Sequence, residues 1–158
     1  MKKFPVSNST YVSIITYGLG LFILFLPLLW AQRAFFHGVN FGILKIVSSL
    51  VLLGVGAYFF ANSPKNLIVD KNTVTIEKNF GKVKIAKADI QKVGTLANNN
   101  LAMTVGSKGF FGFLGKTMGN SQSFVKDRSQ MIKLETSNGD FVLSCKDRAG
   151  FIKAVNEM

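Results

Sequence analysis

The chain has 158 residues, of which 48% are hydrophobic, and a formal net charge of +11. This length suits one modest domain, or a smaller domain joined to a membrane segment. The charge does not indicate a nucleic-acid partner, because residues 65–158 mix all eight carboxylates with fifteen of the nineteen basic residues and contain no arginine-rich run.

The first predicted element after residues 1–10 is a membrane span over Tyr11–Trp30. These twenty residues contain no charged side chain, and as a helix they would cover about 30 Å, the thickness of the hydrocarbon layer. Residues 1–10 are predicted to be a cytoplasmic N-terminal segment. An alternative interpretation makes residues 1–33 a cleaved signal peptide, although the usual apolar core of about 7 to 15 residues is shorter.

The second predicted span is Val39–Ala61, in which Lys45 is the one charged residue. The short connection Ala31–Gly38 predicts an antiparallel hairpin, with both chain ends on one side of the membrane. An intramembrane cation indicates a functional site, or else a side chain that snorkels to the nearer interface. Lys45 is therefore a candidate intramembrane site with a second, structural interpretation.

The basic residues near the span ends predict the orientation. Lys2 and Lys3 precede the first span and three lysines follow the second within residues 65–78, whereas the connection holds only Arg33. The positive-inside rule then places both termini in the cytoplasm. A single cysteine, which cannot form an internal disulfide, suits that reducing compartment.

Residues 65–158 are predicted to form a cytoplasmic domain of short strands. In Thr73–Glu77 apolar and polar residues alternate, which is typical of a half-buried antiparallel strand. Asn138-Gly139 predicts a tight hairpin turn with two positive φ angles, and Asp147 is predicted to cap a helix from Arg148 to about Glu157. The predicted strands are Leu67–Asp70, Thr73–Lys78, Val83–Ala86, Ile90–Leu96, Leu101–Val105, Ser123–Lys126, Met131–Thr136 and Phe141–Cys145.

The stretch GFFGFLGKT at residues 109–117 ends like a nucleotide-phosphate loop. That motif needs a glycine five positions before Gly115, where this chain has Phe110, and it needs a helix afterwards. Residues 118–123 are rich in turn formers and lack a helical apolar period. The spacing and the context both argue against a phosphate site.

The order of several segments resembles the membrane-associated bacterial pleckstrin-homology-like domains, over roughly residues 65 to 157. The resemblance implies a bent β-sandwich of about seven strands with a C-terminal capping helix, so the predicted fold class is an α+β membrane protein with a two-helix transmembrane hairpin. It also implies that the glycine-phenylalanine segment belongs to the sheet and its connecting loop. The segments that carry it are Leu67–Asp70, Thr73–Ile76, Lys84–Ile90, Gly109–Gly115, Ile132–Thr136 with Asn138-Gly139, and Phe151-Ile152.

Residues suited to catalysis are few. His37 lies in the predicted connection between the spans, and Cys145 alternates in phase with Phe141 and Leu143, which predicts a buried core residue. The carboxylates show no metal-ligand spacing, and a solvated surface is expected for Glu77, Asp89, Glu135 and Asp147. The sequence therefore predicts no catalytic, metal or cofactor-binding residue and a protein that is not an enzyme.

Two groups of residues are candidates for contact with a lipid or a partner. Lys82 and Lys84 share a strand face with Lys87 nearby, an arrangement that can hold a phosphate headgroup or remain an ordinary solvated face. The second group is an aromatic patch if exposed and core if buried. It comprises Lys108, Phe110, Phe111, Phe113 and Lys116.

The sequence thus predicts a non-enzymatic inner-membrane protein whose cytoplasmic domain is an interaction or scaffold module, an accessory subunit of a larger membrane assembly. A protein partner or a second copy of the chain is expected. Two alternatives remain open. One is a sensor of anionic-lipid headgroups, and the other is a small pore or an accessory subunit of a transporter built around Lys45.

Overall fold

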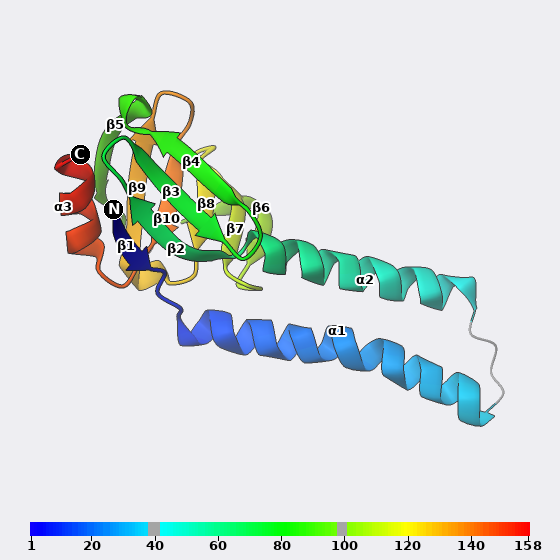
Figure 1. Ribbon diagram of the computed structural model, residues 1–158. Helices are drawn as coiled ribbons and strands as arrows, with labels where there is room; N and C mark the ends of the chain where they lie inside the picture. The colour runs from blue at the N-terminus through cyan, green and yellow to red at the C-terminus, as the bar shows by residue number, and fades with distance from the viewer. Residues whose placement is uncertain (38–41, 98–100) are drawn as a thin grey trace.

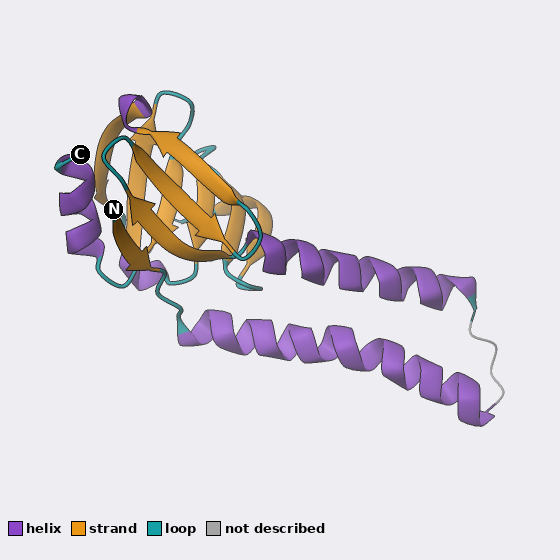
Figure 2. Ribbon diagram, viewed as in Figure 1, coloured by secondary structure: helices purple, strands orange, loops and turns teal. Residues whose placement is uncertain are grey.

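The computed structural model describes residues 1–37, 42–97 and 101–158. Two long helices extend side by side from one end of a mainly β domain, and both chain termini lie in that domain (Figure 1). Figure 2 shows the strands gathered in the domain and a short C-terminal helix packed beside them. The predicted architecture of a helical hairpin followed by a β domain with a terminal helix is confirmed.

Helices α1 (Thr10–His37) and α2 (Ile43–Asn62) are both long and apolar enough to cross a membrane, and few of their described side chains are buried. Ser9 caps α1, since its hydroxyl accepts a hydrogen bond from the Val12 amide at 3.3 Å. The helix continues seven residues beyond the predicted end at Trp30, because residues 31–36 contain no helix breaker. The predicted start of the second span at Val39 lies outside the described residues.

The first sheet has the order β1-β2-β3-β4, and all its strand pairs are antiparallel. Its strands are β1 (Lys2–Pro5), β2 (Pro64–Val69), β3 (Thr73–Lys78) and β4 (Lys82–Ala86). Strand β1 comes from the segment that was predicted to be a separate N-terminal stretch. Phe4 explains why it joins the domain, because its ring is buried and lies edge-on to Phe151 at 5.5 Å.

The second sheet has the order β5-β9-β10-β8-β7-β6. Strands β8 and β10 pair in parallel, whereas the other pairs are antiparallel. The antiparallel pairing predicted for Thr73–Glu77 concerns β3 of the first sheet, where it is confirmed. The strands are β5 (Ile90–Thr95), β6 (Met103–Lys108), β7 (Phe113–Thr117), β8 (Gln122–Val125), β9 (Met131–Thr136) and β10 (Phe141–Ser144).

The main core contains apolar side chains of both sheets and is closed by helix α3 (Arg148–Asn156). Phe151 of α3 is fully buried, and Asp147 caps the helix as predicted, accepting a hydrogen bond from the Gly150 amide at 2.8 Å. A second cluster includes Val12 of α1 and side chains of the six-stranded sheet. The first turn of α1 is therefore part of the folded domain as well as the start of a candidate span.

Three local predictions differ from the structure. Segment 113–117, which was not among the predicted strands although the resemblance assigned the glycine-phenylalanine segment to the sheet and its connecting loop, forms β7. The strand predicted at Leu101–Val105 is shifted to Met103–Lys108. The hairpin between β9 and β10 forms, but only Gly139 of Asn138-Gly139 has a positive φ. The Gly139 amide donates to the Thr136 carbonyl at 3.3 Å, so the connection is longer than a two-residue turn.

Candidate functional site

The turn between β6 and β7 lies against the domain ends of both long helices. Phe110 is buried and its ring contacts Phe59 of α2, with centroids 6.2 Å apart, while the Phe111 ring lies 5.5 Å from Phe60. On the other side, the Phe111 amide donates to the Thr16 hydroxyl of α1 at 2.8 Å. The aromatic patch suspected from the sequence is thus largely packed within the molecule, where it joins the domain to the hairpin.

Glycines in this hairpin permit a backbone that other residues would strain. Gly106 and Gly115 are cross-strand partners with φ values of 124° and 135°, and Gly112 has a φ of 129°. A Cβ atom on Gly112 would lie 2.7 Å from the Val125 carbonyl oxygen. Residues 113–117 are a strand with no helix after them, so the structure supports the argument against a phosphate loop.

The turn between β3 and β4 meets the end of α2. The Asn79 side-chain amide donates to the Phe60 carbonyl at 2.9 Å, and the Phe80 amide donates to the Ala61 carbonyl at 2.9 Å. These bonds satisfy carbonyls that the last turn of a helix leaves unpaired. The Phe80 side chain remains 73% exposed beside the end of α2.

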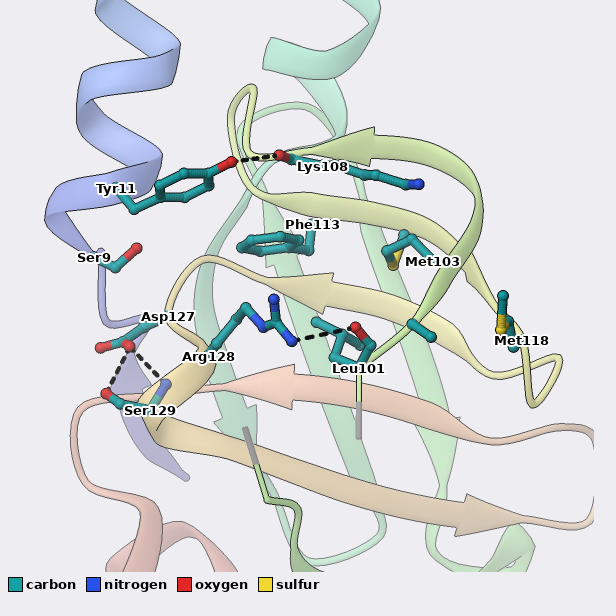
Figure 3. Close-up of a pocket in the computed structure, with 11 residues that line it drawn as sticks. Ser9, Tyr11, Leu101, Met103, Lys108, Phe113, Met118, Asp127, Arg128 and Ser129 are labelled. Atoms are coloured by element: carbon teal, nitrogen blue, oxygen red, sulfur yellow. Dashed lines mark hydrogen bonds between the residues drawn. The ribbon is translucent and has the colours of Figure 1, made fainter. Parts of the chain in front are cut away.

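A cavity of about 650 Å³ lies on the domain side of the first turn of α1. Its apolar lining comes from Tyr11, Met103, Phe113 and Met118, together with Leu101 and Ala102 (Figure 3). Its charged lining comes from Lys108, Asp127 and Arg128. The cavity thus combines an apolar wall with two cations and one carboxylate.

Three of the side chains that line this cavity stack on one another. The Tyr11 and Phe113 rings are nearly parallel with centroids 6.1 Å apart, and the Arg128 guanidinium carbon lies 5.4 Å from the Phe113 centroid. Figure 3 shows Phe113 between Tyr11 and Arg128. Arg128 also donates to the Leu101 carbonyl at 3.4 Å. The guanidinium is therefore positioned by several contacts at once.

The Asp127 carboxylate is hydrogen-bonded to a residue two positions later in the chain. One of its oxygens accepts hydrogen bonds from the Ser129 amide at 2.9 Å and from the Ser129 hydroxyl at 2.7 Å. The neighbouring Lys126 is partly buried, and this desolvation lowers the pKa of its ammonium group. Among these cavity residues the sequence had indicated only Lys108 and Phe113, because the others come together only through folding.

The lysines predicted to share a face lie along an edge of the first sheet. Lys82, Lys84 and Lys87 are all exposed, and β4 is the last strand of its sheet. Within the described residues these three lysines form no ion pair. Lys116 is likewise exposed, on β7 of the other sheet. The structure therefore separates the two predicted groups of contact residues.

Lys45 is the third residue of α2, at the end of the hairpin far from the domain (Figure 1). It is half-buried, and its carbonyl accepts a hydrogen bond from the Ser49 hydroxyl at 2.7 Å. This place near a helix end agrees with snorkelling. A role for Lys45 in transport stays a prediction.

Groups that could react are buried or paired. Cys145 is fully buried, and desolvation raises the pKa of its thiol to about 12. Glu77 pairs with Lys3 at 3.4 Å, and a hydrogen bond from Asn66 lowers the pKa of the Glu77 carboxyl. Within residues 1–37, 42–97 and 101–158, no three His, Cys, Asp or Glu side chains are grouped so as to hold a metal ion.

A known protein family matches the C-terminal part of the chain. The family model described as Bacterial PH domain matches residues 65–158. No curated protein and no solved structure matches the chain significantly. The matched range begins at β2, so the family region contains neither the two long helices nor β1, although β1 is part of the same sheet.

Proposed function

The chain belongs to the bacterial PH domain family, and from this premise we propose that it is a non-enzymatic, membrane-anchored interaction module. In this proposal it is an accessory subunit of a larger assembly in the bacterial inner membrane, with both termini in the cytoplasm. The observation that carries the proposal is the open edge of strand β4, where lysine side chains are exposed. The domain that presents this edge is hydrogen-bonded to both long helices.

The pairing of β1 with β2 supports a two-span topology. Lys2 is the register partner of Val69, which places the segment before α1 beside the segment after α2. If one helix crosses the membrane, the other must cross back. The lysines at this end of the hairpin outnumber Arg33 and Lys45 near the other end, which favours the cytoplasm for the domain.

The same pairing argues against the signal-peptide alternative. Cleavage after residue 33 would remove β1, leave one edge of β2 unpaired and empty the place of Phe4 beside Phe151. An unpaired strand edge and a lost buried ring are both unfavourable. This supports an N-terminal segment that is retained.

The course of β4 favours a protein partner over a flat bilayer. The turn before Lys82 is bonded to the end of α2, whereas the Lys87 amide donates to the Asn72 carbonyl at the opposite end of the sheet. Lys87, the first residue after β4, thus lies about 16 Å beyond Lys82, at about 3.3 Å per residue. Attraction to an anionic surface decays over about 8 Å in physiological salt. An acidic segment of a protein could contact all three lysines at once.

Photocrosslinking of the full-length protein in living cells tests this function. A photoreactive residue at Ala86, between Lys84 and Lys87, should give a discrete protein adduct, and reversing the charge of Lys82, Lys84 and Lys87 to Glu should abolish it. A photoreactive residue at Lys153 on α3 is the control and should not give that adduct. An adduct that survives the charge reversal, or one that contains only lipid, would contradict the proposal.

A further inference from the structure

We propose that the cavity beside the first turn of α1 binds the head region of an anionic phospholipid from the leaflet that the domain faces. This site is separate from the β4 edge and goes beyond the proposed function. The evidence for the site is a cavity lined by apolar side chains and by two cations, at the place where the domain meets a predicted span.

The location brings the cavity to the bilayer surface. Tyr11 is the second residue of α1, and its hydroxyl donates to the Lys108 carbonyl at 3.5 Å, so cavity lining and span share the same helical turn. Tyrosines at span ends settle at the level of the lipid headgroups. A phospholipid can therefore enter the cavity while its acyl chains remain in the leaflet.

The size and lining match an amphiphile. About 650 Å³ lies within the usual range of ligand pockets, roughly 300 to 1,000 Å³. Met103 and Phe113 form an apolar wall, and Met118, which is 78% exposed, lies at the opening. The flexible thioether of methionine adapts to ligand surfaces of different shape.

The charges select an anion. Arg128 and Lys108 outnumber the one carboxylate in the lining, and that carboxylate, Asp127, already accepts two hydrogen bonds from Ser129. A guanidinium suits phosphate because its planar donors match phosphate oxygens. The stack of Tyr11, Phe113 and Arg128 fixes the guanidinium before a ligand arrives, which lowers the entropic cost of binding.

Fluorescence quenching of the full-length protein in nanodiscs tests the site. The chain has one tryptophan, so Trp30→Phe with Met118→Trp gives a single reporter at the cavity opening. Brominated phosphatidylglycerol should quench this reporter more strongly than brominated phosphatidylcholine at the same mole fraction. The double variant Arg128→Gln, Lys108→Gln should weaken the apparent affinity for phosphatidylglycerol by about tenfold or more.

Matched variants distinguish binding at the cavity from a general effect of the positive charge of the protein. Lys116→Gln with Arg148→Gln removes the same charge away from the cavity and should retain the preference. Lys108→Gln alone should weaken it and serves if the Arg128 variant fails to fold, since Lys108 is exposed. Equal quenching by the two lipids, or a preference unchanged by Lys108→Gln, would overturn the proposal. Loss of the preference on adding aqueous glycerol 3-phosphate would assign the cavity to a soluble phosphate compound instead.

Discussion

Two β-hairpin turns meet the long helices by opposite means. The β6–β7 turn packs Phe110 and Phe111 against the ends of α2, whereas the β3–β4 turn leaves Phe80 exposed and bonds to the last carbonyls of the same helix. Each turn places phenylalanine next to glycine. A phenylalanine next to a glycine in a turn is therefore not enough to predict that the phenylalanine ring is buried. Burial of the ring depends on the glycine φ angles and on the helix surfaces available to the ring.

The largest expected difference between the turns lies in their glycines. Gly112→Val should destabilise the protein by about 3 to 4 kcal/mol, because the new Cβ meets the Val125 carbonyl oxygen and the backbone φ is positive. Gly81→Val should cost about 1 to 2 kcal/mol, since that φ is also positive but the nearest atom is a flexible lysine carbon 4.0 Å away. Thermal unfolding in mild detergent measures both. Equal losses would refute the close-packing argument.

The second largest difference in stability is expected between the phenylalanines of the two turns. Phe110→Ala should cost about 3 kcal/mol, because it removes a buried ring and its contact with Phe59. Phe80→Ala should change the free energy of unfolding by no more than about 0.5 kcal/mol in detergent. Chemical unfolding of the two variants compares them directly. A larger loss for Phe80→Ala would reverse the roles assigned to the turns.

A smaller effect is expected at the amide that caps α2. Asn79→Ala should cost about 1 kcal/mol, because the Phe60 carbonyl would lose its hydrogen bond from this side chain. Asn138→Ala, in the turn far from the helices, is the control and should be nearly neutral. Unfolding free energies that are the same for both variants would show that the cap contributes little.

The smallest effect is expected at Lys116. Lys116→Ala should change stability by less than about 0.5 kcal/mol and should alter no nucleotide binding, because the side chain is exposed on a strand. Isothermal titration with ATP and GTP measures the second quantity. Nucleotide binding that the substitution abolishes would restore the phosphate-loop interpretation.

The sequence predicts some elements of this fold correctly and misses others. Strands such as β3 and β9 follow apolar alternation and were predicted at the observed residues, and Asp147 was predicted as a cap from its own chemistry. Strand β1 was missed because four residues with two lysines and a proline carry no strand pattern by themselves. Its place depends on a partner more than sixty residues later in the chain.

The candidate sites show the same limit. The spacing of Lys82 and Lys84 predicts that they share one strand face with Lys87 nearby, whereas the open edge follows only from the strand order. The cavity could not be predicted, because it joins Tyr11 of a long helix, Phe113 of a strand and Arg128 of a short 3-10 helix. Such contacts depend on tertiary packing, whereas periodicity reports only neighbours along one element.

The central claim is that both helices span the membrane and hold the domain on its cytoplasmic side. Labelling of intact cells with a membrane-impermeant maleimide tests it most directly. The native Cys145 is buried with a thiol pKa of about 12 and should stay unlabelled in the folded protein. Gln32→Cys should be labelled from outside, whereas Asn138→Cys should be labelled only after permeabilisation. Labelling of residue 138 but not residue 32 in intact cells would contradict the account.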